Sequence, residues 1–305
     1  MMTMKRAQII HNPSAGNADH TKQELLDAVI KAGYVAQYVS TDDEDAWKTL
    51  RSDNVDIYFL VGGDGTVRKL ADILLTDISD RRIPIHLLPV GTANNIAKTL
   101  KISRIVDTNR ILEAGKIRAF DCGRISGLPG QEFFLESLGF GIFPELIFQM
   151  KQMKSNVDVD ACDKLALAWK VLVQIVKNFE AQKATIEVDG IIINGSFLLV
   201  ELMNIPQLGP NLDLAPDADP GDGLFDLILI PEGRRTDLGV YLDKKINGTS
   251  ENIGLEKFTK TIRARKIKMQ WAGSKAHVDD RLIDNPSQGF EVDLMRNALK
   301  FVGNG

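Results

Sequence analysis

The chain has 305 residues and a formal net charge of -4 at pH 7, and 44% of its residues are hydrophobic. This length exceeds the usual size of one domain and favours two, while the slight acidity excludes a general nucleic-acid binder. No apolar run approaches the roughly 20 residues that a membrane-spanning helix needs. The N-terminus has no signal-peptide pattern, and Cys122 and Cys162 are the only cysteines. We therefore expect a cytoplasmic protein with reduced thiols.

The first third of the chain alternates predicted strands and helices. Thr21 to Glu24 has the form of a capping box and opens the first helix, and Gly33 is suited to end it. Such a βαβα order predicts a parallel sheet with helices on its faces. The predicted strands span residues 7–10, 34–39, 57–61 and 85–88, and the predicted helices follow them near 21–30, 46–50, 67–74 and 96–100.

The turn Gly62-Gly63-Asp64-Gly65-Thr66 lies between a buried strand and a helix. Its glycines allow the backbone to approach a bulky anion, which would face amide N–H groups and the helix N-terminus. An acid such as Asp64 suits this place if a metal ion or a ribose hydroxyl is also present. The alternative is a tight glycine-rich turn in which Asp64 caps a helix.

Polar loops follow all four predicted strands. The carboxyl ends of parallel strands share one edge of the sheet, where ligands of α/β proteins bind. Small hydrogen-bonding residues on every loop of that edge predict a site for a polyanionic ligand. Neither G-x-x-x-x-G-K-[ST] nor a G-x-G-x-x-G after the first strand is present. The loops are residues 12–16, 40–41, 62–66 and 91–95.

Three of these loops resemble the diacylglycerol kinase catalytic domain family, which includes bacterial lipid kinases and the sphingosine and ceramide kinases. The motifs are Asn-Pro-Ser-Ala-Gly at 12–16, Gly-Gly-Asp-Gly-Thr at 62–66 and Pro-Val-Gly-Thr-Ala-Asn-Asn at 89–95, in matching order and spacing. NAD kinases and phosphofructokinases share the Gly-Gly-Asp-Gly loop, but the other two motifs fit lipid kinases better. The resemblance implies an α/β N-terminal domain with a parallel sheet, like that of NAD kinase and phosphofructokinase, and an all-β sandwich as C-terminal domain.

The alternation of strands and helices stops after Gly123. Short apolar runs with turn signals between them, such as Asn194-Gly195, and one strong helix at 162–179 suit a β-sandwich with an inserted helix. The predicted strands are 121–125, 133–138, 184–188, 191–193, 197–202, 225–230, 262–264, 267–270 and 275–278.

The resemblance also implies that the last strand, about 297–302, returns to the first domain. The alternative is a strand that pairs within the sandwich. We therefore expect a nucleotide-binding domain at 1–122 with about 295–305, and a substrate domain at 123–294.

The resemblance implies transfer of the γ-phosphate of ATP, with Mg²⁺, to a hydroxyl of diacylglycerol or a similar lipid. Asp64 is the candidate for coordinating the catalytic Mg²⁺, and the resemblance places Asp121 as a second acid near the metal. Asp279 is the nearest matched acid for a base, and its alternative role is that of an ordinary hairpin Asp. The residues expected to bind ATP are Asn12, Ser14, Gly16, Thr41, Gly62, Gly63, Asp64, Gly65, Thr66, Gly91, Thr92 and Asn94.

A second metal site is expected at Asp219, Asp222 and Leu224. In the similar bacterial kinases this loop holds a structural magnesium, to which Asp219 and Leu224 would offer backbone oxygens and Asp222 its carboxylate. The alternative is a polar turn without a metal.

The chain departs from the family at three acidic positions, which are Lys69, Asn95 and Arg281 here. Arg68 and Lys69 either neutralise phosphates or lie on the solvated surface. One interpretation is an active kinase with a rearranged metal network. The others are a kinase fold that binds nucleotide or lipid without efficient transfer, and a kinase for a non-lipid acceptor. The retained glycines favour the first interpretation.

A dense apolar cluster follows Gly139 and is interrupted by Lys151 and Lys154. It suits either contact with lipid or packing in the core. The sequence leaves open which lipid is the acceptor, whether the protein visits a membrane surface and whether it forms a homodimer. The cluster consists of Phe140, Phe143, Leu146, Ile147, Phe148, Met150 and Met153.

Overall fold

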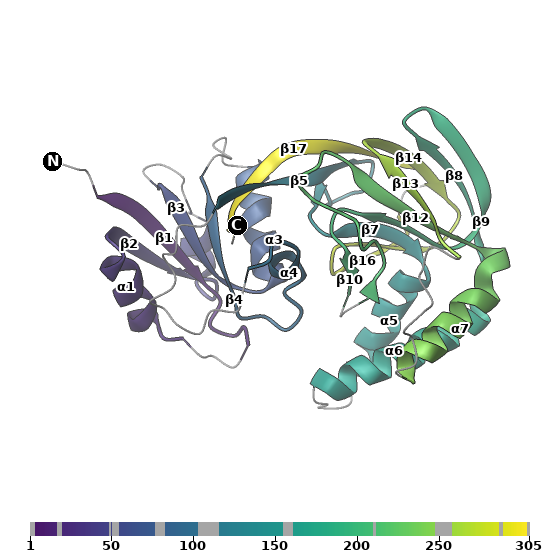
Figure 1. The fold of residues 1–305 in the computed structure, drawn as a ribbon, viewed down its shortest axis with the longest axis horizontal. Coiled ribbons are helices and arrows are strands. Elements are labelled where there is room, and N and C mark those ends of the chain that lie inside the picture. The colour runs from purple at the N-terminus through teal and green to yellow at the C-terminus, as the bar shows by residue number, and fades with distance from the viewer. Residues whose placement is uncertain are drawn as a thin grey trace. The chain divides into compact units, whose positions relative to one another are not determined.

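The computed structural model describes residues 4–16, 20–48, 50, 55–76, 83–102, 116–154, 161–209, 212–247, 258–286 and 289–303. The chain divides into two compact units, Met1–Asp121 with Arg296–Gly305, and Cys122–Met295. Strands β5 (Lys116–Ser126) and β17 (Phe290–Gly303) both cross the boundary between the units (Figure 1). Each unit is stabilised by an apolar core of its own.

The first unit is built on a parallel sheet with the strand order β4-β3-β1-β2. The middle strand β3 is buried along its whole length, as its continuous apolar sequence predicts. Helices connect successive strands, so the predicted parallel sheet with helical crossovers is confirmed. The strands are β1 (Lys5–His11), β2 (Tyr34–Ser40), β3 (Ile57–Gly62) and β4 (Ile85–Pro89), and the helices are α1 (Lys22–Lys31), α2 (Glu44–Lys48), α3 (Asp64–Thr76) and α4 (Asn95–Thr99).

Local signals set the ends of α1. The Glu24 N–H donates to the Thr21 hydroxyl oxygen at 3.3 Å, and the Thr21 N–H donates to the Glu24 carboxylate at 2.8 Å. This reciprocal pair is the predicted capping box. Gly33 follows the helix with a φ of 87°, a conformation that glycine adopts without strain.

The second unit is mainly antiparallel, with the order β16-β15-β7-β9-β8-β14-β17, and β12 and β13 extend from β9. Its strands surround a core rich in aromatic rings, where Phe140 packs against Trp271 and Phe290 with ring centroids 5.2 and 5.1 Å away. The strands are β6 (Phe133–Phe134), β7 (Ser137–Gly141), β8 (Gln182–Val188), β9 (Ile191–Met203), β12 (Phe225–Pro231), β13 (Lys260–Ala264), β14 (Lys266–Trp271), β15 (Lys275–Val278) and β16 (Arg281–Asp284), with a separate pair β10 (Gln207–Leu208) and β11 (Leu212–Asp213).

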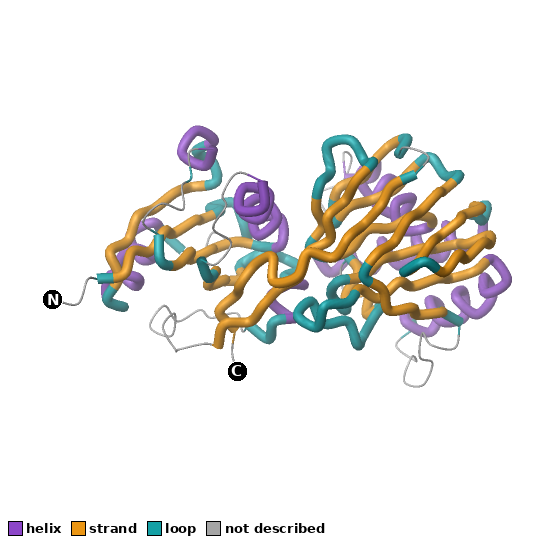
Figure 2. The backbone as a smooth tube through the Cα atoms, turned by 90° about the horizontal axis from the view of Figure 1, so that it is seen from above, coloured by secondary structure: helices purple, strands orange, loops and turns teal. Residues whose placement is uncertain are grey.

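The helices of the second unit gather on one side of its strands (Figure 2). They are α5 (Ile142–Lys154), α6 (Ala161–Asn178) and α7 (Arg235–Ile246), with a short 3-10 turn at Glu232–Arg234. Phe143 and Leu146 of α5 are buried in the core layer between these helices and the strands. Most of the apolar cluster after Gly139 is therefore core, whereas Met153 at the end of α5 is 40% exposed.

Several sequence-based predictions for this unit were wrong. Asn194-Gly195 is not a turn, because residues 191–203 form one continuous strand, β9, whose Gly195 pairs with Ala184 of β8. The ladder with β8 outweighs the local turn signal. The predicted strand 133–138 is broken into β6 and β7, and α5 and α7 were not predicted.

The C-terminal strand β17 pairs in both units. Its first half pairs antiparallel with β14 of the second unit, from Lys266↔Asp293 to Met269↔Phe290. Further along, Phe301 pairs in parallel with Ile85 of β4 in the first unit. Within the predicted strand 297–302, Phe301 thus pairs in the first unit, and the pairing with β14 lies before this stretch, at residues 290–293.

The Phe301 ring tests how strongly the C-terminal strand is held in the first unit. It is fully buried and meets the Phe120 ring edge-on, with centroids 5.3 Å apart. We expect Phe301→Ala to lower the free energy of unfolding by about 3–5 kcal/mol, because it leaves a cavity, as measured by urea denaturation. The control Ile117→Ala removes a side chain that is 59% exposed and should change it by less than about 0.5 kcal/mol. Equal effects of both substitutions would contradict this packing.

Candidate active site

Three motif loops of the first unit meet at the carboxyl edge of its parallel sheet. The Asn12 N–H, just after β1, donates to the Val61 carbonyl oxygen at the end of β3 at 2.9 Å. The Val90 N–H, just after β4, donates to the Gly62 carbonyl oxygen at 3.1 Å. The structure therefore brings the loops at 12–16, 62–66 and 89–95 together, as the parallel topology predicts.

Glycines allow these loops to touch through their backbones. A Cβ atom on Gly91 would lie only 2.6 Å from the Cα of Gly63, and a Cβ on Gly16 would lie 2.2 Å from the Val90 carbonyl oxygen. Gly65, the second residue of α3, differs because an added Cβ would meet nothing within 4 Å. The first three glycines are thus required by packing, whereas Gly65 leaves open space at the N-terminus of a 13-residue helix.

Polar side chains link the same loops. The Asn12 side-chain oxygen accepts hydrogen bonds from the Ser14 hydroxyl at 2.8 Å and the Ser14 N–H at 3.2 Å, and its amide nitrogen lies 3.3 Å from the Thr66 hydroxyl oxygen. Asn94 has a φ of 52° and donates to the Gly91 carbonyl oxygen at 2.6 Å. Its own Oδ1 is buried and accepts no hydrogen bond from the described residues. It is therefore available to a ligand donor.

Two threonines of the expected nucleotide site lie on loops of the same edge. Thr41 follows β2, and its N–H donates to the His11 carbonyl oxygen at 2.8 Å. Thr92 is exposed on the loop after β4. Their loops are placed by the sheet, and their part in nucleotide binding stays a prediction.

The Asp64 carboxylate caps the helix α4. It accepts the Asn95 N–H at 3.0 Å and the Ile96 N–H at 3.1 Å, at the start of α4. Asn95 itself is buried. The bonds tie the loop after β3 to the loop after β4 and satisfy donors that a helix N-terminus leaves unpaired.

Asp121, the second expected acid, is buried in β5 and accepts the Asn297 N–H at 2.7 Å. Asn297 has a φ of 51°, so this bond holds an unusual backbone conformation in β17. Throughout the described ranges, no group of three or more His, Cys, Asp or Glu side chains is arranged to hold a metal ion. A magnesium ion bound to Asp64 and Asp121 stays a prediction.

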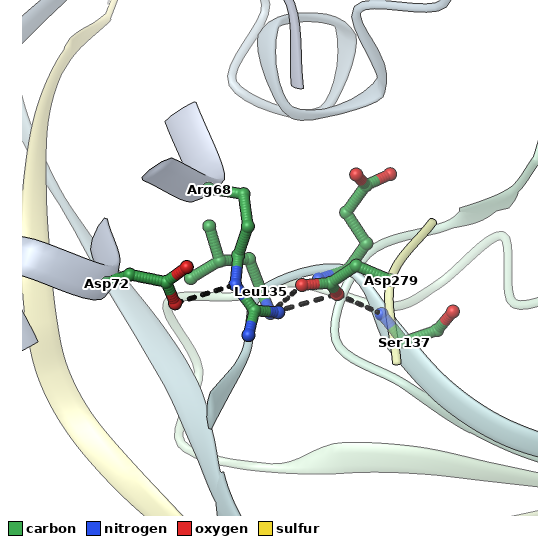
Figure 3. Close-up of polar contacts among 6 residues, drawn as sticks. Arg68, Asp72, Leu135, Ser137 and Asp279 are labelled. Atoms are coloured by element: carbon green, nitrogen blue, oxygen red, sulfur yellow. Dashed lines mark hydrogen bonds and ion pairs between the residues drawn. The ribbon is translucent and has the colours of Figure 1, made fainter. Parts of the chain in front are cut away.

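Asp279 lies in the two-residue turn between β15 and β16, with a φ of 52°. Its Oδ1 accepts N–H groups of Leu135, Glu136 and Ser137 at 3.1, 2.8 and 3.2 Å (Figure 3). Its own N–H donates to the Ser137 carbonyl oxygen at 2.8 Å. Asp279 is therefore a hairpin Asp and also a buried carboxylate that three backbone donors hold in place.

Arg68 is buried in the first unit and does not lie on the solvated surface. Its Nε lies 2.9 Å from the Asp72 carboxylate, one turn further along α3 (Figure 3). Lys69 beside it is exposed. Of this pair of basic residues, Arg68 is thus buried and held by an ion pair, whereas Lys69 faces solvent.

The loop expected to hold a structural magnesium is held by arginines. The Asp222 carboxylate forms an ion pair with Arg263 and also accepts the Leu224 N–H at 2.9 Å. The Gly223 carbonyl oxygen accepts a hydrogen bond from Arg265 at 3.3 Å, and the Asp219 carbonyl oxygen accepts the Asp222 N–H at 3.2 Å. These contacts do not fit a metal at Asp222, because a guanidinium already neutralises its charge.

Sequence reasoning missed Arg263 because it lies 41 residues from Asp222. The signal that could have found it is the pairing of β12 with β13, which places Arg263 opposite Asp226.

A model of the diacylglycerol kinase catalytic domain matches residues 6–125. A second model, the YegS C-terminal NAD kinase beta sandwich-like domain, matches residues 153–284. Residues 6–125 therefore belong to the diacylglycerol kinase catalytic domain family, and the sandwich domain follows them in the chain. The predicted fold class, an α/β domain followed by a β-sandwich, is confirmed with it.

Relatives and solved structures agree with this assignment. A diacylglycerol kinase of Bacillus subtilis (strain 168) is 28% identical over 235 residues, which is 74% of each chain. One of Staphylococcus aureus (strain MRSA252) is 28% identical over 252 residues, covering 77% of this chain and 73% of that one. A crystal structure described as a diacylglycerol kinase from Bacillus anthracis covers 100% of this chain and 98% of its own, with a TM-score of 0.70 and 16% identity. Yeast NADH kinase gives a TM-score of 0.50 at 9% identity, covering 100% of this chain and 85% of its own, so these two structures show the fold alone.

Two further observations concern the cysteines and the helices. Cys122 is buried and is not part of a disulfide, and the side chain of Cys162 lies outside the described residues. None of the helices that the structure describes is long and apolar enough to cross a membrane.

Metal removal tests the arginine-held loop. We expect EDTA to leave the melting temperature of the nucleotide-free protein unchanged, because Arg263 already occupies the Asp222 carboxylate. Differential scanning calorimetry with and without added Mg²⁺ measures this. A drop in melting temperature that Mg²⁺ reverses would mean that the loop binds the metal.

Proposed function

We propose that this protein is an ATP-dependent lipid kinase, which transfers the γ-phosphate of ATP to a hydroxyl of diacylglycerol or a similar lipid. Membership of the diacylglycerol kinase family supports a phosphotransferase acting on an alcohol. Such an enzyme would work in the cytoplasm and reach its acceptor by transient contact with a membrane surface.

The observation that carries the proposal is the glycine-lined edge of the first unit. Gly63 and Gly91 bring two loops into backbone contact, and Gly65 leaves open space at the start of α3. Helix N-termini with exposed amides bind phosphate groups, because the N–H groups and the helix dipole both favour negative charge. The backbone N–H donors at the start of α3 and the Asn94 Oδ1 acceptor together suit a nucleoside triphosphate.

Mg²⁺, when bound with ATP, would neutralise charge that develops on the transferred phosphoryl group. Asp64 is the residue that would contribute carboxylate oxygen to it. Phosphate oxygens and water usually complete the shell of Mg²⁺ in kinases.

Asp279 is the proposed general base. In the transfer step the acceptor oxygen forms a bond to the γ-phosphorus, its proton passes to the Asp279 carboxylate, and the bond to the bridging oxygen of ADP breaks. The three backbone donors on Oδ1 keep this carboxylate fixed and desolvated in one orientation. Arg281 cannot take this role because a guanidinium accepts no proton.

A second candidate function follows from the lost acids. Lys69, Asn95 and Arg281 replace acidic residues of the family, and Asn95 is buried with its N–H bonded to Asp64. A protein with these changes could bind nucleotide without efficient transfer, or serve a non-lipid acceptor.

Phosphate transfer separates these functions. With γ-labelled ATP, Mg²⁺ and mixed micelles of diacylglycerol, phosphatidylglycerol, sphingosine or ceramide, we expect label in one lipid. Asp279→Asn should lower kcat by about 10²–10⁴-fold, the usual contribution of a general base. Label in none of the lipids, with ATP still raising the melting temperature, would favour the second function. If Asp279→Asn turns over at the wild-type rate, Asp279 is not the general base.

Gly65→Ala tests the nucleotide site itself. The variant should fold as stably as the wild type, because an added Cβ meets nothing within 4 Å. It should nevertheless lose the rise in melting temperature that ATP causes, because the methyl group occupies the space assigned to phosphate. Gly239→Ala is a matched control, since Gly239 lies in α7 and also has open space around its Cβ position. If both variants keep the ATP effect, the phosphate lies elsewhere.

A further inference from the structure

A buried acid–base pair lies on the helix-facing side of the second unit's strands. His277 of β15 and Glu201 of β9 both have fully buried side chains. The ring Nε2 of His277 lies 2.8 Å from Glu201 Oε1 and 3.1 Å from Oε2. Ala276 and Val278, the neighbours of His277, face the aromatic core on the other side, so alternation along β15 turns the ring toward the helices.

Gly139 makes this contact sterically accessible. His277 pairs with Gly139 of β7, and Gly139 pairs with Glu201 of β9, so β7 runs between the two side chains. A Cβ atom on Gly139 would lie 1.9 Å from Glu201 Oε2. The His277 ring and the Glu201 carboxylate therefore meet over the place that a side chain of β7 would fill.

The other ring nitrogen reaches the turn that carries Asp279. Nδ1 of His277 lies 2.8 Å from the Asp279 carbonyl oxygen. The Asp279 carbonyl is an acceptor, so Nδ1 donates to it, and an ionised Glu201 would accept from Nε2 and make the ring an imidazolium. Burial opposes this charge, but the charge and hydrogen bond of Glu201 and the Asp279 carbonyl together raise the pKa of His277 above its ordinary value.

The surroundings of the ring leave these partners in control of its charge. The titratable groups that face it are Glu201 on β9 and Asp279 in its own turn. From the other elements, β7 contributes Gly139, and α5 contributes Phe143, whose ring meets the imidazole edge-on at 4.8 Å. Glu145 of α5 forms an ion pair with Lys275 of β15 at 2.9 Å, and neither is among the groups that shift the pKa of His277.

Stability alone is a weak reason for a buried charged pair. Apolar residues of similar volume often stabilise a core as well as an ion pair does. The pair is instead linked to the turn of Asp279, whose φ of 52° lies in the left-handed region that Asp enters more readily than most non-glycine residues. The His277 bond fixes the carbonyl of Asp279 while its carboxylate accepts three backbone N–H groups.

We propose that Glu201 and His277 are positioning residues that hold the Asp279 carboxylate in the orientation needed to accept the proton of the acceptor hydroxyl. This inference rests on the proposed kinase function, in which Asp279 is the base. His277 contacts the Asp279 backbone, and Glu201 contacts His277. Neither residue touches a reacting atom.

Kinetics and imidazole NMR test this positioning role together. We expect Glu201→Gln to lower kcat about tenfold, with the KM for ATP unchanged, because the base loses its orientation while the nucleotide site is untouched. The alkaline limb of the kcat–pH profile should move to lower pH. Without the Glu201 carboxylate the pKa of His277 falls, so the imidazolium loses its proton at lower pH. In Asp279→Asn, adding Glu201→Gln should cause no further loss of kcat, since both substitutions act through one carboxylate.

The control is Asp226→Asn, which neutralises another buried carboxylate of the same unit and should keep both kcat and its pH profile. If Asp279→Asn loses activity while Glu201→Gln keeps it, the positioning role is wrong and the kinase proposal stands. If Asp279→Asn keeps full activity, the base assignment fails and the positioning role fails with it.

Should Glu201→Gln not fold, the ¹⁵N spectrum of wild-type imidazoles still decides. Two protonated nitrogens on His277 between about pH 6 and pH 8 support the pair, and one unprotonated nitrogen overturns it.

Discussion

The close approach of Gly63 and Gly91 is the contact on which the candidate site depends. Two backbones meet where a single added methyl group would lie 2.6 Å from the opposing Cα. Because the loops can touch, the Asp64 carboxylate reaches the first amides of α4, and the N-terminus of α3 stays at the edge of the sheet. A side chain on Gly91 would clash with the backbone of Gly63 at this contact.

Two arginines are held by ion pairs near the candidate sites. Arg68 is buried against Asp72 in α3, and Arg263 neutralises Asp222 in the loop where related kinases are expected to hold a metal. Arginine suits both places because its guanidinium stays charged and offers several donors at fixed angles. At three positions where the resemblance to the kinase family implies acids, the chain has Lys69, Asn95 and Arg281. The acidic residues proposed for catalysis are therefore Asp64, Asp121 and Asp279.

The sequence predicted the first unit well because its signals are local. The capping box at Thr21 needs only the next three residues, and the parallel order of the strands follows from alternating apolar periods. The edge loops followed for the same reason, since each comes directly after a strand.

The second unit was harder to predict because its contacts join distant residues. Asn194-Gly195 has the sequence of a turn, but pairing with β8 keeps it extended. The amides that hold Asp279 lie more than 140 positions before it, and Glu201 meets His277 across a third strand. No local pattern encodes these contacts, and only the assembled sheet reveals them.

The most direct test of the central claim is mass spectrometry of a total bacterial lipid extract after incubation with the protein and ATP labelled with ¹⁸O in its γ-phosphate. We predict that one class of lipid alcohol gains a labelled phosphate with the wild type and not with Asp279→Asn. A protein that binds ATP but adds labelled phosphate to no lipid in the extract would contradict the assignment as a lipid kinase.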